Sequence, residues 1–386
     1  MRRTEEPDPS LGDRGRGEQP APSPHEEAER RVRSRDPHSV RCPSVAVRLG
    51  IVLLLCNGPS PAETPRPTQL PPDARRHAHE HAGLGTVGSP AAGGNIDPTT
   101  YLTTWNFSNL PPGEREKFYR ETPLSGGSML REYRFYTVNK EIEIAPGVSF
   151  PAWTYNGQVP GPTVRATVGD RIRIRFVNQG DRPHTIHFHG FHPPEMDGSD
   201  PSHFVLPGEE FVYEFEADPV GVHLYHCHSL PLTQHIHKGL YGVYIVDPKV
   251  PRAPARELIM MMNGFDTNFD EENEVYAVNT HAFYYVHHPI QVQKGELVRI
   301  YLVNILEFDM INSFHVHAHF FTEYRTGTLS APTSYTDTIV LGQAERSILE
   351  LRFRYPGQFM FHAHKTEFAE KGWHGLFEVT ESEGGR

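Results

Sequence analysis

One cysteine held between two histidines, in the run Tyr225-His226-Cys227-His228, constrains this chain more than any other feature of its sequence. In an extended strand, successive side chains point to opposite faces of the sheet. Cys227 then faces one side, while His226 and His228 face the other. Thiolate and imidazole are ligands that soft and borderline transition metals accept. The run predicts two metal sites on opposite faces of one strand, joined by a few covalent bonds.

Two blocks of strand-like sequence surround this run. The first includes the alternating segment 171–176, and the second includes the alternating segment 298–302. Short alternating strands separated by Gly and Pro turns are typical of β-sandwiches. We therefore expect an all-β chain with one domain at 128–247, a Pro-rich linker at 248–256 and a second domain at 257–381.

The N-terminal region has a different composition. Residues 1–62 form a polar leader that we expect to be disordered, and residues 63–127 should be polar and largely irregular. Within the leader, an apolar run at 45–56 follows several arginines and precedes Ser60-Pro61-Ala62. This order is typical of a signal peptide, so we expect export to the periplasm or the medium. The run is too short for a transmembrane anchor. A lipid anchor on Cys56 fits less well, because Leu55 is not small.

Charge and cysteine usage narrow the function. The chain carries 37 Lys and Arg against 48 Asp and Glu, a net charge of −11, which disfavours nucleic-acid binding. Two of its three cysteines, Cys42 and Cys56, lie in the leader. Once a signal peptide is removed, Cys227 has no disulfide partner, and its histidine neighbours favour a role as a metal ligand.

The two blocks read as internal repeats. Each has a Gly-Asp or Gly-Glu turn, a strand ending in Asn, a His-x-His pair and, much later, a second His-x-His pair. On a strand, such a pair places both imidazoles on the same face. Eight imidazoles exceed the needs of one metal ion, whereas three copper ions could share them. The four pairs are His187 and His189, His226 and His228, His315 and His317, and His362 and His364.

A second set of ligands remains around the cysteine. His184, Cys227 and His235 match the two-histidine, one-thiolate arrangement of blue copper sites. The position expected for a weak axial ligand holds Leu240, which cannot coordinate, so we expect a three-coordinate copper. His237 is the alternative to His235; the spacing to Leu240 favours His235.

Together with Tyr155-Asn156-Gly157-Gln158-Val159-Pro160-Gly161-Pro162 and the segment 359–367, these motifs resemble those of multicopper oxidases, in particular two-domain forms with the blue site in the first domain. The resemblance spans about residues 130–380. It implies two cupredoxin-like Greek-key β-sandwiches and about four copper ions per chain. By position, type 1 copper would take His184, Cys227 and His235; type 2 would take His187 and His315; and type 3 would take His189, His226, His228, His317, His362 and His364.

The resemblance also implies an activity and an assembly. Single electrons from phenols, aromatic amines or metal ions would enter at type 1 copper, and O2 would be reduced to water at the trinuclear cluster. The laccase-like reading is the default, because the chain has no Met-rich insert. Similar two-domain members form homotrimers with each cluster across a subunit boundary. Oxygen reduction consumes protons, and Asp197 and Glu367 are the candidate proton carriers.

Two other functions and two histidine features stay open. Copper-containing nitrite reductases share the domains and the trimer, but that family has an Asp where this chain has His187 and lacks a histidine after the cysteine. A copper-binding protein without enzymatic activity is the second alternative. His319 extends the pair at 315 and 317 and could support the ligands, and the tract at 77–81 could scavenge copper.

Overall fold

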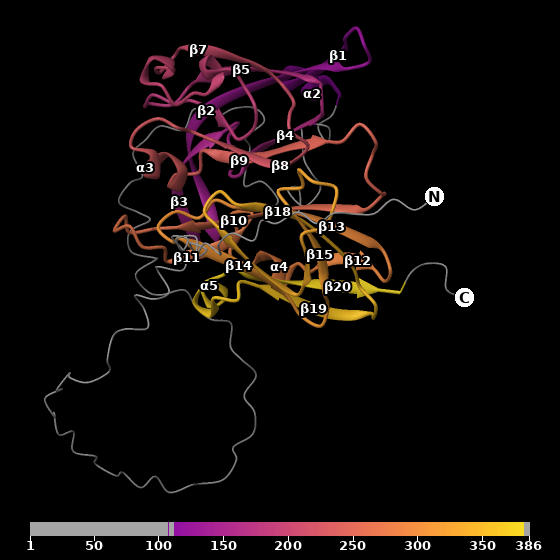
Figure 1. Cartoon of the computed structure of the whole chain (residues 1–386). Helices are drawn as coiled ribbons and strands as arrows, with labels where there is room; N and C mark the ends of the chain where they lie inside the picture. Colours follow the sequence, from indigo (N-terminus) through magenta and orange to yellow (C-terminus); the bar gives the residue numbers. More distant parts are fainter. Residues whose placement is uncertain (1–106, 108–111, 382–386) are drawn as a thin grey trace, which may run out of the picture. The chain divides into compact units, whose positions relative to one another are not determined.

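The computed structural model describes residue 107 and residues 112–381, all within one compact unit of the chain. The expected leader at 1–62, its signal peptide and the tract at 77–81 lie outside the described residues. The described part confirms the all-β fold class, with two β-sandwiches in sequence (Figure 1). A short helix and strand β1 lie at the end of the 63–127 segment.

The first sandwich contains two sheets. One has the order β1-β2-β5-β7, with β3 paired to β2, and the other has the order β4-β9-β8-β6. In β5, Ile172, Ile174 and Phe176 are fully buried, which is the alternation that the sequence predicted. The strands are β1 Tyr119–Pro123, β2 Met129–Ala145, β3 Val148–Tyr155, β4 Gly161–Thr167, β5 Arg171–Asn178, β6 His187–Phe188, β7 Glu210–Glu216, β8 Gly221–His226 and β9 Tyr241–Asp247.

The second sandwich also contains two sheets, and each has one strand more than the corresponding sheet of the first sandwich. Their orders are β11-β10-β13-β18-β15-β16 and β12-β20-β19-β14-β17. The strands are β10 Arg256–Phe265, β11 Val275–Val278, β12 Ile290–Gln293, β13 Leu297–Asn304, β14 Ile311–Val316, β15 Phe321–Arg325, β16 Ser334–Thr336, β17 Thr338–Gly342, β18 Arg346–Arg352, β19 Gly357–His362 and β20 His374–Thr380.

Helices are few and short. None of those in the described part is long and apolar enough to cross a lipid bilayer. The α-helices are α2 Pro112–Phe118, α3 Leu232–His237, α4 Tyr284–His287 and α5 Thr366–Glu370, and the 3-10 helices are η3 Pro194–Met196 and η4 Pro201–His203.

Equivalent strands pair in the same way in both sandwiches. β2 runs parallel to β5 as β10 runs parallel to β13, and β6 pairs antiparallel with β8 as β14 pairs with β19. Even the residue that ends β5 and β13 is repeated. The side-chain oxygen of Asn178 accepts from the Gly180 amide, and that of Asn304 accepts from the Leu306 amide. The two copies therefore share both topology and turn chemistry.

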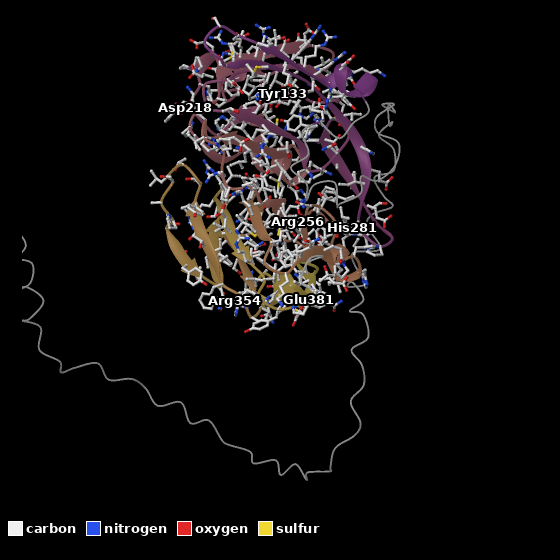
Figure 2. The ribbon with its side chains drawn as sticks, turned by 90° about the vertical axis from the view of Figure 1, so that its right-hand side faces the viewer. Tyr133, Asp218, Arg256, His281, Arg354 and Glu381 are labelled. Carbon is white, nitrogen blue, oxygen red and sulfur yellow. The ribbon has the colours of Figure 1, made fainter. Side chains whose placement is uncertain are left out.

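The sandwiches share a continuous apolar core. Ile144 and Phe150 of the β2–β3 hairpin pack in one cluster with Met261 and Val275 of the second sandwich. Backbone bonds cross the same boundary: the Ala282 amide donates to the Ile144 carbonyl at 2.8 Å. Figure 2 shows Arg256 and His281 in the zone where the sandwiches meet. The Cys227 strand and the second sandwich therefore belong to one packed body.

A network of charged side chains lies beside the linker. Arg165 of β4 contacts Asp247 and Glu257, each at 2.6 Å, and Arg299 contacts Glu257 at 3.2 Å. The Tyr301 hydroxyl also donates to Glu257 at 2.8 Å. Although burial opposes ionisation, the Arg165 guanidinium holds the pKa of Glu257 below its ordinary value. Glu257 therefore ties strands of both sandwiches together.

We predict that Glu257→Gln lowers the free energy of unfolding by about 2 kcal/mol at pH 7, because it removes charged hydrogen bonds and leaves Arg165 and Arg299 with one carboxylate partner each, Asp247 and Glu350, instead of two. The folded pKa of Glu257 is depressed, so this stabilisation is complete above the unfolded pKa of about 4.3 and is lost as the pH falls through the folded pKa. Urea titrations at pH 7 and pH 3 measure both effects. Glu210→Gln, which removes an exposed partner of Arg175, is the control and should change stability by less than about 1 kcal/mol. Equal losses in the two variants would contradict the prediction.

Candidate metal centre

His184, Cys227 and His235 meet in the interior of the first sandwich, and we call them the cysteine site. Cys227 Sγ lies 3.1 Å from His235 Nδ1 and 3.9 Å from His184 Nδ1, and the two Nδ1 atoms are 3.2 Å apart. Metal bonds to nitrogen and sulfur of roughly 2.0–2.3 Å put trigonal ligand atoms roughly 3.5–4 Å apart. The three atoms are therefore close enough to hold one metal ion, and their types suit copper.

Backbone bonds fix the loop that carries these ligands. The Cys227 amide donates to the Leu240 carbonyl at 2.9 Å, and the Leu240 amide donates to the His235 carbonyl at 3.2 Å. The Thr185 amide donates to Cys227 Sγ at 3.3 Å. Leu240 is fully buried in the same apolar cluster as Cys227, so the residue predicted at the axial position adds no ligand atom.

His237 lies apart from the cysteine site, although sequence spacing left it as an alternative. Its Nε2 accepts from the Asp266 amide at 3.0 Å, and its ring packs against Phe150 and Phe308. Residues two apart on a helix such as α3 point to different sides. Only His235 of the two faces Cys227.

Burial keeps the cysteine site neutral without metal. The rings of His184 and His235 are almost fully buried beneath Trp153, whose ring centroid lies 5.5 and 4.8 Å from theirs. Burial lowers the pKa of His184 to about 3 and that of His235 to about 4, and it raises the pKa of the Cys227 thiol. His184 Nε2 is buried with no hydrogen-bond partner. Both imidazoles are therefore uncharged at neutral pH, as metal ligands must be.

The first histidine set, which comprises His187, His189, His226 and His228, lies on the other side of the Cys227 strand. His187 of β6 is paired with His226 of β8, and its ring centroid is 5.2 Å from each of the other three. The Nε2 atoms of His189 and His226 are 3.3 Å apart. Four imidazoles therefore converge, and two of them, His226 and His228, are the sequence neighbours of Cys227 in the cysteine site.

The second histidine set, which comprises His315, His317, His362 and His364, repeats this geometry in the second sandwich. His315 is paired with His362, and its ring centroid lies 5.0–5.4 Å from the other three. The Nε2 atoms of His317 and His362 are 3.0 Å apart. The two sets differ at the residue between their later histidines. This residue is Cys227 in the first set and the buried Ala363 in the second.

Hydrogen bonds orient rings in both sets. His226 Nδ1 donates to the Cys227 carbonyl at 2.9 Å, and His362 Nδ1 donates to the Ala363 carbonyl at 2.7 Å. His315 Nδ1 reaches the Asp337 carbonyl at 2.9 Å in the same way. A ring that donates from Nδ1 carries its lone pair on Nε2, so these three nitrogens are available to a metal.

The two sets differ in exposure. His226 is buried and the rest of the first set is half-buried, whereas His317 and His364 of the second set are exposed. Within the described residues, the close groups of possible ligands include three members of one set or of the other, and none combines the two. The chain therefore presents two separate groups of imidazoles.

Asp197 lies beside the first set. Its Oδ1 is 3.2 Å from His187 Nδ1, which donates to the Asp197 carbonyl at 2.9 Å, and 3.7 Å from His192 Nε2. Partial burial raises the pKa of Asp197, but a short hydrogen bond from Ser199 and the nearby histidines outweigh it and hold the pKa below its ordinary value. A carboxylate at this place can orient His187 and carry a proton.

Glu367 lies in a different environment from the one that its spacing suggested. It is half-exposed on α5, where Lys371 donates to its carboxylate at 2.9 Å, and this bond lowers its pKa. No hydrogen bond or ion pair joins Glu367 to a histidine within residues 112–381. Its proximity to His364 in sequence does not bring it into the second set.

Sequence reasoning missed one pair of supporting residues. The Thr185 hydroxyl accepts from the His228 amide at 3.0 Å, and the Ser313 hydroxyl accepts from the His364 amide at 2.8 Å. Both hydroxyls stand two residues before a His-x-His pair, so the repeat [Ser/Thr]-x-His-x-His was a signal in the sequence. These bonds hold the two histidine-bearing segments of each set together.

His319 supports the second set without joining its ligands. It is buried between Phe353 and Phe359, and its Nδ1 donates to the His317 carbonyl at 3.3 Å. Its Nε2 accepts from the Arg354 amide at 3.1 Å. Both ring nitrogens are therefore occupied by backbone groups.

Comparison with known proteins agrees with this geometry. A crystal structure of a multicopper oxidase is 50% identical, with a TM-score of 0.70, over 76% of this chain and 100% of that chain. The multicopper oxidase mgLAC is 28% identical, with a TM-score of 0.57, over 64% of this chain and 86% of that chain. A copper-containing nitrite reductase of Neisseria gonorrhoeae is 27% identical over 270 residues, which are 64% of this chain and 68% of that protein.

Two family matches divide the chain as the two sandwiches do. Residues 137–251 match one multicopper oxidase family and residues 251–383 match another. These matches imply copper as the cofactor and cupredoxin-like sandwiches as the fold. Since the two matches together cover more than half of the sequence, the chain belongs to the multicopper oxidases.

Proposed function

We propose that this chain is a laccase-like oxidase, which takes single electrons from phenols, aromatic amines or metal ions and reduces O2 to water. The observation that carries this proposal is the pair of matching four-histidine sets, one of them joined to the cysteine site through Cys227. Eight imidazoles suit a trinuclear copper cluster, and the cysteine site suits a type 1 copper.

About four copper ions per chain would be held by the residues already described. His184, Cys227 and His235 would hold type 1; His187 and His315 would hold type 2; and the other six histidines of the two sets would hold the type 3 pair. Bound copper would supply one-electron redox chemistry at both places.

The protein contributes the path between the two places. Cys227 is bonded directly to His226 and His228, and the hydrogen bond from His226 Nδ1 to the Cys227 carbonyl adds a second connection of 2.9 Å. Trp153 and the surrounding apolar side chains exclude water from the cysteine site. A dry, rigid ligand set changes little when its charge changes by one electron.

Asp197 is the proposed proton carrier on the first-set side, because it contacts His187 and is 30% exposed at its side chain. It can therefore take a proton from solvent and release it beside the first set. Glu367 is the corresponding proposal on the second-set side, although in the single chain its carboxylate is bonded to Lys371 and not to a histidine.

The separation of the two histidine sets leads us to propose that complete clusters form between chains. The exposed His317 and His364 of one subunit would meet the first set of the next subunit in a head-to-tail homotrimer. We also propose export, on the strength of the signal-peptide pattern at 31–62, which lies outside the described residues.

Copper nitrite reduction is the second candidate, and its support is the 27% identity to the Neisseria gonorrhoeae enzyme. A three-histidine catalytic copper, which the resemblance gives to that family, would leave His187 and His228 without purpose. In this chain the ring centroids of His187 and His228 are 5.2 Å apart. The oxidase proposal uses both as ligands of the trinuclear cluster.

The test compares the two acceptors directly. Copper-loaded protein is given 2,6-dimethoxyphenol with O2, or the same reductant with nitrite under argon. The oxidase proposal expects one O2 consumed for every four electrons delivered and no nitric oxide. Nitric oxide with no O2 uptake would establish the reductase, and inactivity with phenols, aromatic amines and Mn(II) would establish the non-enzymatic role.

We predict that Asp197→Ala slows O2 reduction by roughly 10–100-fold, because a positioned proton carrier contributes about that much, and leaves the absorption of the cysteine site intact. Stopped-flow reoxidation of the reduced enzyme by O2 measures the effect. Asp200→Ala, in the same loop, removes two exposed hydrogen bonds that Asp200 accepts from the amide and hydroxyl of Ser202, and it should be neutral. Unchanged reoxidation in Asp197→Ala would exclude the proposed role.

We predict that two inactive variants restore activity when they are mixed. His189→Ala breaks the first set and His317→Ala breaks the second, so neither forms a whole cluster alone. After dissociation and reassembly of a 1:1 mixture, about a quarter of the interfaces in a head-to-tail ring pair two intact sets. O2 uptake should then reach about a quarter of the unmutated rate. If the mixture stays inactive while the mixed oligomers form, the cluster does not lie between chains.

A further inference from the structure

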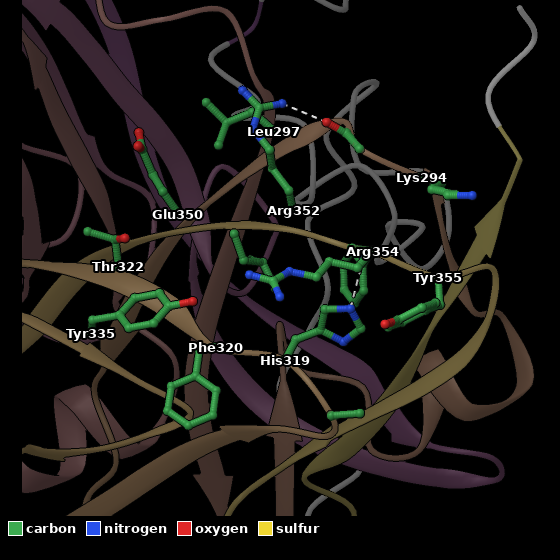
Figure 3. Close-up of a pocket in the computed structure, with 14 residues that line it drawn as sticks. Lys294, Leu297, His319, Phe320, Thr322, Tyr335, Glu350, Arg352, Arg354 and Tyr355 are labelled. Carbon is green, nitrogen blue, oxygen red and sulfur yellow. Dashed lines mark hydrogen bonds between the residues drawn. The ribbon is translucent and has the colours of Figure 1, made fainter. Parts of the chain in front are cut away.

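The outer face of the second sandwich carries a hollow of about 690 Å³ that the proposed reaction does not use. We call it the basic pocket. It lies over β15, β16 and β18 and the turn before β13, and Figure 3 shows its lining. Its volume is in the range of small-molecule sites. The side chains that matter here are Lys294, Phe320, Tyr335, Arg352, Arg354 and Tyr355.

The basic pocket is positively charged on a chain whose net charge is −11. It is lined by three cations, Lys294, Arg352 and Arg354, and by one acid, Glu350. Glu350 is already paired with the buried Arg299 at 2.7 Å, so it does not neutralise the pocket. A local positive field on an acidic protein favours small anions.

Arg354 is the one of these three cations whose side-chain donors have no partner in the described part of the chain. Lys294 contacts the Glu381 carboxylate at 3.2 Å, and Arg352 donates to the Gly295 carbonyl at 2.6 Å. No ion pair or side-chain hydrogen bond to Arg354 is found within residues 112–381. In Figure 3 its side chain runs across the pocket toward Tyr335. A guanidinium in this position presents its donor fork to a ligand.

Aromatic rings surround this guanidinium. Of the five large aromatic side chains that are exposed in the described part, three line the basic pocket: Phe320, Tyr335 and Tyr355. The Phe320 and Tyr335 rings are 51% and 65% exposed and lie 5.4 Å apart at 33°. Such rings are costly to leave in water and offer stacking surfaces to a planar apolar group.

The pocket wall is rigid where it meets the second histidine set. His319 lies in the wall, accepts from the Arg354 amide and donates to the His317 carbonyl. Phe353 and Phe359 hold its ring on both sides. The backbone of Arg354 is therefore held in place, which fixes the point from which its side chain enters the pocket.

We propose that the basic pocket binds a small aromatic carboxylate. The carboxylate pairs with Arg354, and the ring packs against the exposed faces of Phe320 and Tyr335. The site is separate from the cysteine site, which lies in the first sandwich, and its occupancy does not depend on the proposed oxidase reaction. It is thus a second, non-catalytic site for the acid class of aromatic compounds.

The test is calorimetric titration of copper-loaded, full-length protein with benzoate, which phenol oxidases do not consume. Arg354→Gln removes the charge but keeps the backbone bond to His319, so the fold is preserved; thermal unfolding checks this. Arg256→Gln, at an exposed arginine outside the pocket, is the matched control. Tyr335→Ser tests the aromatic contact, and benzamide and acetate are the comparison ligands.

We expect Arg354→Gln to weaken benzoate binding by at least about tenfold, as loss of a charged hydrogen bond should. Tyr335→Ser should weaken benzoate by several-fold, and Arg256→Gln should change it less than twofold. Benzamide and acetate should both bind the unmutated protein more weakly than benzoate. Benzoate binding that is absent, or that is equal in Arg354→Gln and the unmutated protein, would overturn the proposal. Equal binding of benzamide or of acetate would overturn the assigned ligand class.

Discussion

The register between β6 and β8, repeated between β14 and β19, is the constraint on which the rest of the site depends. It sets His187 opposite His226 and His315 opposite His362. Side chains alternate along a strand, so a slip of one residue would turn the histidines inward and Cys227 outward. The apolar neighbours, Phe188 and Tyr225, occupy the alternate positions and are fully buried. Core packing thus enforces the register that gathers the imidazoles.

Burial then prepares these imidazoles chemically. It lowers the pKa of His226 to about 4, and it also holds the pKa values of His187 and His189 below their ordinary values. Backbone carbonyls accept hydrogen bonds from Nδ1 of His226, His315 and His362, which leaves the lone pair of each Nε2 able to bind metal. His317 is exposed, and its described ring contacts are to other histidines of the second set. The first set, on the β4-β9-β8-β6 sheet, is buried or half-buried, whereas two histidines of the second set, on the β12-β20-β19-β14-β17 sheet, are exposed.

Much of this could be predicted from the sequence, because strand periodicity acts over two or three residues. The spacing of the His-x-His pairs predicted that both histidines of a pair lie on one face of a strand. The repeated order of motifs in the two blocks predicted two similar sandwiches. Features that depend on a helix or a fold-wide contact were harder. The choice of His235 over His237 depends on the short helix α3, and the carboxylate of Glu367 is drawn to Lys371 by the turn of α5. The separation of the two histidine sets depends on packing between sandwiches, which no local pattern encodes. Thr185 and Ser313 carried a repeated signal and were overlooked.

The most direct test of the account is the copper content of the purified, copper-loaded protein, measured with its absorption and electron paramagnetic resonance spectra. The account predicts about four copper ions per chain, an intense thiolate-to-copper band in the visible, and a near-ultraviolet shoulder from a coupled pair. Cys227→Ser should lose the visible band and one copper. The control Ala363→Ser introduces serine at the equivalent position of the second sandwich and should lose neither. About two copper ions per chain with no coupled pair would favour the nitrite reductase arrangement. A protein with no visible band would show that Cys227 is not a ligand and would contradict the account at its centre.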